Sequence, residues 1–215
     1  MDLIARTQQY VKRRLLTELP DSQGAYRYTH TLRVAALGRE LARAEGLDEE
    51  MLVLGCLLHD IGYVACQTQA DYDDHGLLSS QIAAEFLAAE GYDPQKAASV
   101  CYGVRIHTQE EAQFARPATP LELSVGDADN IDRFDAWRLY EGLHWLKPEQ
   151  LSCAGLREQA QKRVQGHERL RNLSFATPTA QQLWNQRLDL CVAYYARLEA
   201  QMTATLAWDA QPEQL

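Results

Sequence analysis

Apolar positions recur at helical spacing along the whole chain. Ala35 and Ala36 stand three and four positions after Leu32, so the three share one face of a helix expected over residues 25–45. No run shows the strict alternation of a half-exposed strand, and no Asn-Gly or Asp-Gly hairpin turn is present. The pattern therefore predicts an all-α protein.

Proline, glycine and capping residues divide this pattern into separate helices. Pro20 ends the first, Gly46 ends the second, and the pair Asp93-Pro94 is a typical helix start. The expected helices cover about residues 2–19, 25–45, 48–60, 75–90, 94–107, 120–135, 136–146, 148–171 and 177–206, and the sixth either continues or kinks into the next. We expect loops at 21–24 and 61–74, and a frayed tail from Asp209.

Length and the placement of polar residues indicate how the chain is organised. A chain of 215 residues suits one domain, or one domain with a helical appendage. Candidate reactive residues occur only before residue 148, so residues 1–147 are expected to form the functional domain. Residues 148–215 are expected to form a C-terminal helical extension that packs on the same domain, and the sequence leaves open whether it covers the site or forms a homodimer.

Composition excludes some partners. The net charge of −9 argues against nucleic acid, because binding its phosphates requires a basic face. No apolar stretch approaches the ~20 residues that cross a membrane, and the first residues lack the order of a secretory signal. The five cysteines show no CxxC spacing, so reduced thiols are expected. We therefore expect a cytoplasmic protein without a membrane partner.

The doublet His59-Asp60 ends the apolar run 51–58 and is followed directly by Ile61-Gly62. An imidazole and a carboxylate at the buried end of an apolar helix are costly to desolvate without partners. A divalent metal ion would satisfy both groups, and Gly62 would permit a close turn after them.

Further candidate ligands stand before and after this doublet. His30 lies on the preceding helix, His75 and His107 stand at helix ends, and Asp129 follows downstream. Asp129 and Asp132 share a helix face, whereas Asp127 points elsewhere. Taken alone, each of these residues is more often a solvated or core residue than a ligand.

Their order is far more specific. A histidine, a His-Asp doublet about 29 residues later and a downstream aspartate, in an all-helical chain, resemble the HD-domain superfamily of metal-dependent phosphohydrolases. The resemblance covers about residues 25–145 and implies the helical bundle of that family. It implies that a first metal ion is bound by His30, His59, Asp60 and Asp129.

The resemblance also implies a second ion. In many members, histidines placed like His75 and His107 hold it, and an aspartate, here Asp60, bridges the two ions. The expected cofactor is one or two divalent ions, from the group Mn, Fe, Ni, Co, Mg or Zn. One departure concerns the substrate: many members have a lysine after the His-Asp-Ile-Gly motif, and here the position is Tyr63. Asn130 also replaces an arginine common in small members, and Arg133 follows.

The expected chemistry is hydrolysis by a metal-activated water. His59 and Asp60 would hold the metal. Asp132 would position a water or act as a general base, and a role in orienting a metal ligand is equally open. Arg33, one turn after His30, is the first candidate for binding the phosphate, followed by Arg105 and Arg133, although each could be a surface arginine in a weak ion pair.

These residues predict a metal-dependent phosphohydrolase that cleaves a phosphate ester or anhydride of a nucleotide or another small phosphorylated metabolite. Two alternatives stay open. The same ligands also resemble those of the di-iron HD-type oxygenases. A non-catalytic binding module could also retain a metal ion while its helical extension recruits a partner.

Overall fold

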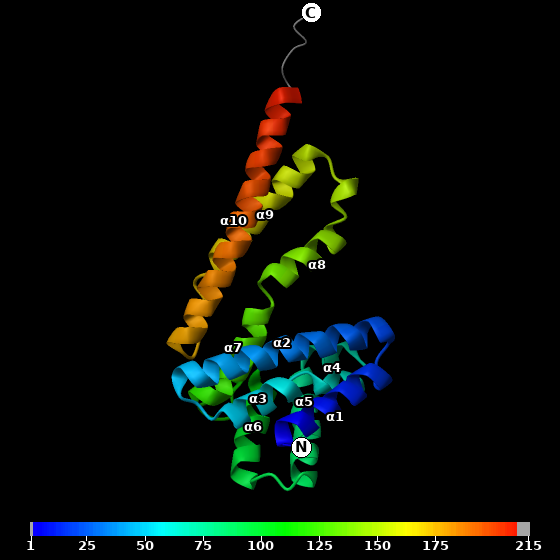
Figure 1. Cartoon of the computed structure of the whole chain (residues 1–215), viewed down its shortest axis with the longest axis vertical. Coiled ribbons are helices and arrows are strands. Elements are labelled where there is room, and N and C mark those ends of the chain that lie inside the picture. Colours follow the sequence, from blue (N-terminus) through cyan, green and yellow to red (C-terminus); the bar gives the residue numbers. More distant parts are fainter. Residues whose placement is uncertain (1, 210–215) are drawn as a thin grey trace, which may run out of the picture. The chain divides into compact units, whose positions relative to one another are not determined.

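The computed structural model describes residues 2–209, including all their side chains except that of His144. Over this range the secondary structure is entirely helical, which confirms the predicted all-α class (Figure 1). Among the described helices, none is long and apolar enough to cross a membrane.

Contacts divide the chain into two compact units. The first comprises Met1–Asp132 and Phe175–Ala180, and the second comprises Arg133–Ser174 and Gln181–Leu215. By these contacts, α8 (Ala136–Leu146) belongs to the second unit. A domain boundary near residue 147 stays a prediction.

The first unit is a bundle of helices around α3. Its helical elements are α1 (Leu3–Glu18), α2 (Asp21–Glu45), α3 (Glu49–Leu58), η1 (Ile61–Ala65), α4 (Gln69–Asp73), α5 (His75–Ala89), α6 (Pro94–Ile106), η2 (Glu111–Gln113) and α7 (Pro120–Asp132). Every residue of α3 from Leu52 to Leu58 is buried, because α1, α2, α6 and α7 all pack against this helix. A helix that is apolar on all sides requires such a position. The His59-Asp60 doublet consequently emerges from the middle of the bundle.

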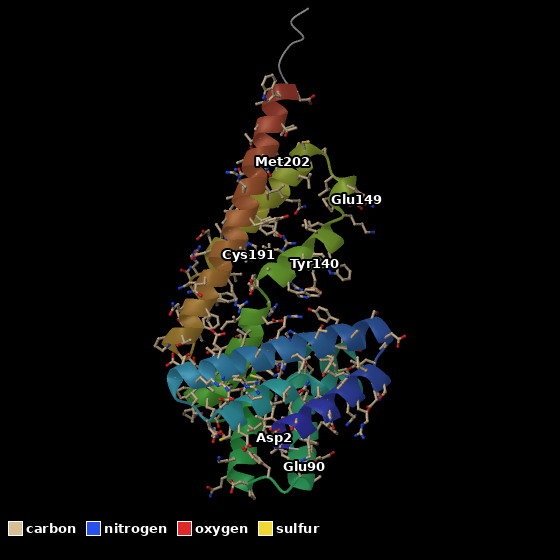
Figure 2. All side chains as sticks on the ribbon, viewed as in Figure 1. Asp2, Glu90, Tyr140, Glu149, Cys191 and Met202 are labelled. Carbon is tan, nitrogen blue, oxygen red and sulfur yellow. The ribbon has the colours of Figure 1, made fainter. Side chains whose placement is uncertain are left out.

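Side chains fill the space between these helices (Figure 2). Leu15, Leu54, Leu58 and Leu87 form a shared core. At its edge, Glu90 after α5 pairs with Arg6 of α1 at 2.6 Å.

The prediction of loops at residues 21–24 and 61–74 is wrong, because both segments contain helical structure. Residues 21–24 are helical, because α2 begins at Asp21, directly after Pro20. Gly24, expected in the loop, lies inside the helix, where an added Cβ would clash with the carbonyl oxygen of Leu15. The glycine is therefore needed for the close approach of α1 and α2 rather than for a turn.

The segment 61–74 also contains helical structure, η1 and α4. Thr68 and Asp71 form a reciprocal capping box that starts α4. Gly62 lies within η1, and an added Cβ would meet the backbone nitrogen of Ser79 at 2.5 Å. Its role is to let η1 lie directly on α5.

The second unit is built from α8, η3 (Pro148–Gln150), α9 (Cys153–Leu170) and α10 (Pro178–Asp209), whose first residues belong to the first unit. Trp184 of α10 is buried and donates a hydrogen bond to the carbonyl of Leu170 at 3.0 Å. Its ring meets Phe134 edge to face. The predicted C-terminal helical extension is thus present. Residues 210–215, most of the expected frayed tail, lie outside the described range.

Candidate metal centre

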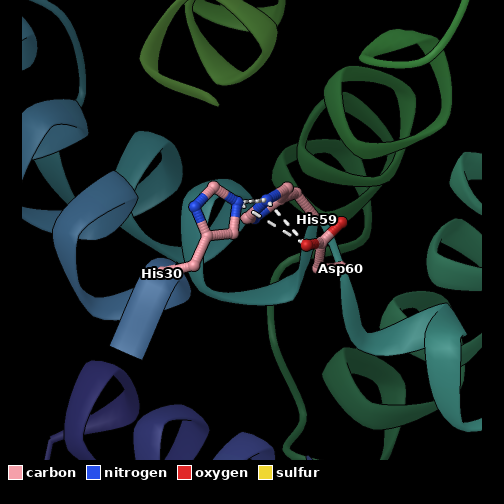
Figure 3. A group of neighbouring side chains, drawn as sticks. All are labelled: His30, His59 and Asp60. Carbon is pink, nitrogen blue, oxygen red and sulfur yellow. Dashed lines mark hydrogen bonds and ion pairs between the residues drawn. The ribbon is translucent and has the colours of Figure 1, made fainter. Parts of the chain in front are cut away.

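His30, His59 and Asp60 converge at the centre of the first unit (Figure 3). His30 comes from α2, and the other two follow α3. The Nε2 atoms of the two histidines lie 3.2 Å apart. Oδ2 of Asp60 lies 3.6 Å from Nε2 of His30 and 3.5 Å from Nε2 of His59.

Two neighbours in sequence reach the same point because the chain leaves the helix between them. His59 still has helical backbone angles, whereas Asp60 has φ −103° and ψ 5°. These angles lie in the sparsely populated bridge region, where residues of active sites are often found. The end of α3 therefore directs both side chains inward.

Asp129 completes this first group. It lies on α7, and its Oδ1 is 3.1 Å from Nε2 of His30 and 3.8 Å from Nε2 of His59. Asp127, expected to point elsewhere, accepts a hydrogen bond from the backbone of Ala176 at 2.9 Å. The structure thus brings together all four residues predicted to hold a first ion, and their role as ligands stays a prediction.

A second group shares Asp60. His75 begins α5 and His107 follows α6, and their Nε2 atoms lie 3.1 Å apart. Oδ1 of Asp60 is 3.0 Å from Nε2 of His75 and 3.8 Å from Nε2 of His107. One oxygen of Asp60 therefore faces each group, which is the arrangement of a carboxylate that bridges two ions.

The hydrogen bonds of the four imidazoles show whether cations fit here. Each Nδ1 faces an oxygen that can only accept a hydrogen bond, so each ring donates through Nδ1. These acceptors are Oδ2 of Asp132 for His30 at 2.8 Å, and the carbonyls of Cys56 for His59 at 2.8 Å, Tyr72 for His75 at 2.8 Å and Val104 for His107 at 2.6 Å. Neutral rings then present lone pairs on Nε2.

When both rings of a group are neutral, two such lone pairs point at each other across about 3 Å, with carboxylate oxygens beside them. Neutral imidazoles in this geometry cannot hydrogen-bond to one another. A divalent ion in each group would bind these nitrogens and the oxygens of Asp60. The residues present therefore fit one or two metal ions, and the mixed nitrogen and oxygen set suits Mn, Fe, Co, Ni or Zn.

The ionisation of these groups agrees with cation binding. Burial lowers the pKa of His59 to about 4 despite the nearby charges of Asp60 and Asp129, so this ring is neutral. Burial would raise the pKa of Asp129, but the hydrogen bond from His30 and the positive charge of that ring hold it at about 2. The pKa of Asp60 likewise lies well below its ordinary value, because adjacent histidines and Arg27 outweigh the cost of burial.

At His30 a proton can take the place of a metal ion. Burial lowers its pKa, but hydrogen bonds to Asp129 and Asp132 outweigh burial and raise the pKa to about 10. Two buried carboxylates thus require a positive charge at this point. Metal binding would displace that proton.

Arg27 is a residue of this site that the sequence reasoning missed. Its Nη1 donates to Oδ2 of Asp60 at 2.8 Å, and its guanidinium lies 3.6 Å from the ring centroid of Tyr63. That tyrosine ring in turn lies 4.4 Å from the ring of His75. Arg27 therefore places a cation beside Tyr63, the position at which many members of the family have a lysine. A signal existed, since Arg27 stands three residues before His30 on the same helix face.

The arginines predicted to bind substrate lie in different surroundings. Arg33 donates to both oxygens of Asp132, at 2.8 and 2.9 Å, while Asp132 also accepts from His30. Arg105 forms a two-fold ion pair with Asp74 at 2.6 and 3.1 Å. Arg133 begins the second unit, and its role stays a prediction.

Comparisons with known proteins identify the fold and the family of the chain. No curated protein matches the chain. Two crystal structures resemble it over nearly their whole length. One, a predicted HD superfamily hydrolase from an uncultured Thermotogales bacterium, is 20% identical with a TM-score of 0.63 and covers 90% of this chain and 91% of its own. The other, an HD-superfamily hydrolase from Bacillus thuringiensis, is 17% identical with a TM-score of 0.60 and covers 97% of both chains.

At these identities the likeness shows a shared fold, that of HD superfamily hydrolases. The model of the HD domain matches residues 27–137, more than half of the chain. This range begins at Arg27 and contains both groups of candidate ligands. The chain therefore belongs to the HD-domain family.

Proposed function

We propose that this protein is a metal-dependent phosphohydrolase that cleaves a phosphate ester or anhydride of a nucleotide or another small phosphorylated metabolite. The observation that carries the proposal is the position of Asp60, whose two oxygens each face a separate pair of imidazole nitrogens. When bound, divalent ions in such a site lower the pKa of a coordinated water and neutralise charge on a phosphoryl group.

The residues of the chain divide the remaining work. His30, His59 and Asp129 would hold the first ion, His75 and His107 the second, and Asp60 both. Asp132 accepts three hydrogen bonds, one from His30 and two from Arg33. Its carboxylate is thereby occupied, which favours a role in orienting His30 over one as a general base.

Arg27 is the side chain best placed to bind the phosphate. Its guanidinium is stacked on Tyr63 and lies beside Asp60, with about a quarter of its side chain exposed. With ions bound to Asp60, the donors of Arg27 would be available to an anionic substrate, and its fork suits two phosphoryl oxygens. Arg33 would act on substrate only indirectly, through Asp132.

The ligand set of four histidines and two aspartates also supports a second candidate, a di-iron HD-type oxygenase. The expected substrate of either enzyme is a small molecule. A non-catalytic module would retain the ions without turnover. Nucleic acid is a poor partner for a chain with a net charge of −9.

The deciding experiment begins with elemental analysis of protein purified without chelator. A phosphate-release screen over nucleotides and sugar phosphates follows, with Mn, Ni, Co or Mg added. Phosphate release by the wild type that is lost in Asp129→Asn and kept in Asp127→Asn would support the proposal, because Asp127 lies on the same helix but faces Ala176. Metal-loaded protein that consumes oxygen and releases no phosphate would instead identify an oxygenase, and inactivity in both assays would identify a binding module.

A further inference from the structure

The ion pair between Asp74 and Arg105 crosses from the start of α5 to the end of α6. Asp74 directly precedes His75, and Arg105 stands two residues before His107. Both nitrogens of the guanidinium fork engage both oxygens of the carboxylate, at 2.6 and 3.1 Å. Each member of the pair thus stands one or two residues before a histidine of the second ligand group.

The two helix ends are in direct contact at this point. An added Cβ on Gly76 would meet Oγ1 of Thr108 at 2.6 Å and the carbonyl oxygen of Arg105 at 2.7 Å. Thr108 also reaches Oδ1 of Asp74 at 3.5 Å. The absence of a side chain at residue 76 lets the helices approach, and the ion pair holds them in one register.

We propose that Asp74 and Arg105 form a positioning pair that sets the spacing of His75 and His107 and thereby determines the affinity of the second ion. The inference rests on the metal centre of the proposed function. Neither residue touches the reacting atoms. The pair acts through the backbone, since Asp74 is adjacent to His75 and Arg105 stands two residues before His107. Each histidine also donates its Nδ1 hydrogen to a backbone carbonyl, that of Tyr72 for His75 and that of Val104 for His107.

Two physical arguments favour this role over a purely stabilising one. The Asp74 side chain is 45% exposed, and an ion pair so open to solvent contributes little to folding stability. The geometric requirement is far stricter, because two imidazole nitrogens 3.1 Å apart bind a cation well only when both lone pairs point at it.

Charge is the second argument. Arg105 is a permanent cation beside a site that must accept a divalent ion, and without Asp74 it would repel that ion. Paired with Asp74, the guanidinium braces the helices without adding net positive charge. This pairing favours a positioning role for Arg105 over the phosphate-binding role predicted from the sequence.

The first ligand group shares only Asp60 with the second. His30, His59 and Asp129 come from α2, the end of α3 and α7, and none of the contacts described for Asp74 or Arg105 involves them. Disrupting the pair should therefore weaken binding of the second ion and leave binding of the first unchanged. A general loss of folding would weaken both.

The test is a calorimetric titration of metal-free, full-length protein with Mn²⁺, supported by elemental analysis after dialysis. We expect Arg105→Met to leave the first binding step unchanged and to weaken the second by about 10- to 100-fold, as is typical for groups that orient metal ligands. Arg105→Lys keeps the charge but loses the guanidinium fork. Its affinity for the second ion should lie between those of the wild type and Arg105→Met. Asp74→Asn should weaken the second step as well and provides a second route if Arg105→Met does not fold.

The matched control is Arg43→Met, which removes a similar two-fold pair with Glu49 remote from the site. It should bind both ions like the wild type. Two ions bound with wild-type affinity by Arg105→Met, an equal loss of both steps, or a single ion in the wild type would each overturn the inference. If the wild type binds two ions and Arg105→Met one, but no phosphate ester or anhydride is cleaved, the proposed function fails while the positioning role stands.

Discussion

Oδ1 of Asp60 lies 3.0 Å from Nε2 of His75, while its other oxygen faces His30 and His59. This relationship connects residues from separate helices through one carboxylate. It makes Asp60 the one described residue that belongs to both groups of candidate ligands.

Replacing Asp60 should therefore remove both ions at once. We expect Asp60→Ala to lose most bound metal and all activity while remaining helical, because each ion loses an anionic ligand. His59→Ala should also lose most bound metal and all activity. Elemental analysis and circular dichroism check this, with Asp127→Asn as the control on α7. Wild-type metal content in either variant would contradict the assignment of these ligands.

Loss of a histidine from the second group should have a narrower effect. His75→Ala and His107→Ala should each reduce the number of bound ions from two to one, since the first group keeps all its members. The stoichiometry from elemental analysis measures this directly. Unchanged stoichiometry would reassign the two histidines as substrate contacts.

Removing Arg27 should weaken substrate binding. A charge-assisted hydrogen bond of about 1.5–3 kcal/mol corresponds to roughly a 10- to 100-fold rise in KM for Arg27→Ala. Arg27→Lys should recover part of this loss, because the charge remains while the fork does not. Steady-state kinetics of the metal-loaded enzyme give the values, and metal content should stay at the wild-type level. An unchanged KM would show that Arg27 serves only to hold Asp60.

The stability of the fold at low pH should depend on Glu122, which is not one of the candidate metal ligands. Its carboxylate accepts from Ser99 at 2.8 Å, from the backbone of Thr119 at 2.9 Å and from Arg116 at 2.7 and 3.0 Å. Burial would raise its pKa, but these partners outweigh burial and lower the pKa from 4.5 to about 2.

Because the folded pKa is the lower one, this contribution is fully present above about pH 4.5 and is lost as the pH falls towards 2. It amounts to about 2–3 kcal/mol, since Arg116 is half exposed and partly screened. Urea unfolding of the wild type and Glu122→Gln at pH 6 and pH 3 should show a larger difference at pH 6. The exposed variant Glu85→Gln should follow the wild type at both values, and equal differences at pH 6 and 3 would count against the mechanism.

The helical class, most helix boundaries and the chemical types of the candidate ligands could be read from local pattern. Periodicity, prolines and caps act over a few residues, so they are visible in a linear chain. The same holds for the break after His59, because an apolar helix that ends in two polar groups already indicates a buried site.

Other features depended on helices far apart in sequence. Spacing alone could not distinguish Arg27, which contacts Asp60, from Arg33, which contacts Asp132. Gly24 reads as a loop residue until α1 is seen to cover it. The partner of Arg105 was equally hidden, since Asp74 lies 31 residues earlier. Which charge neutralises which is decided by distance in the folded bundle, because Coulomb and hydrogen-bond energies depend on separation in space rather than along the chain.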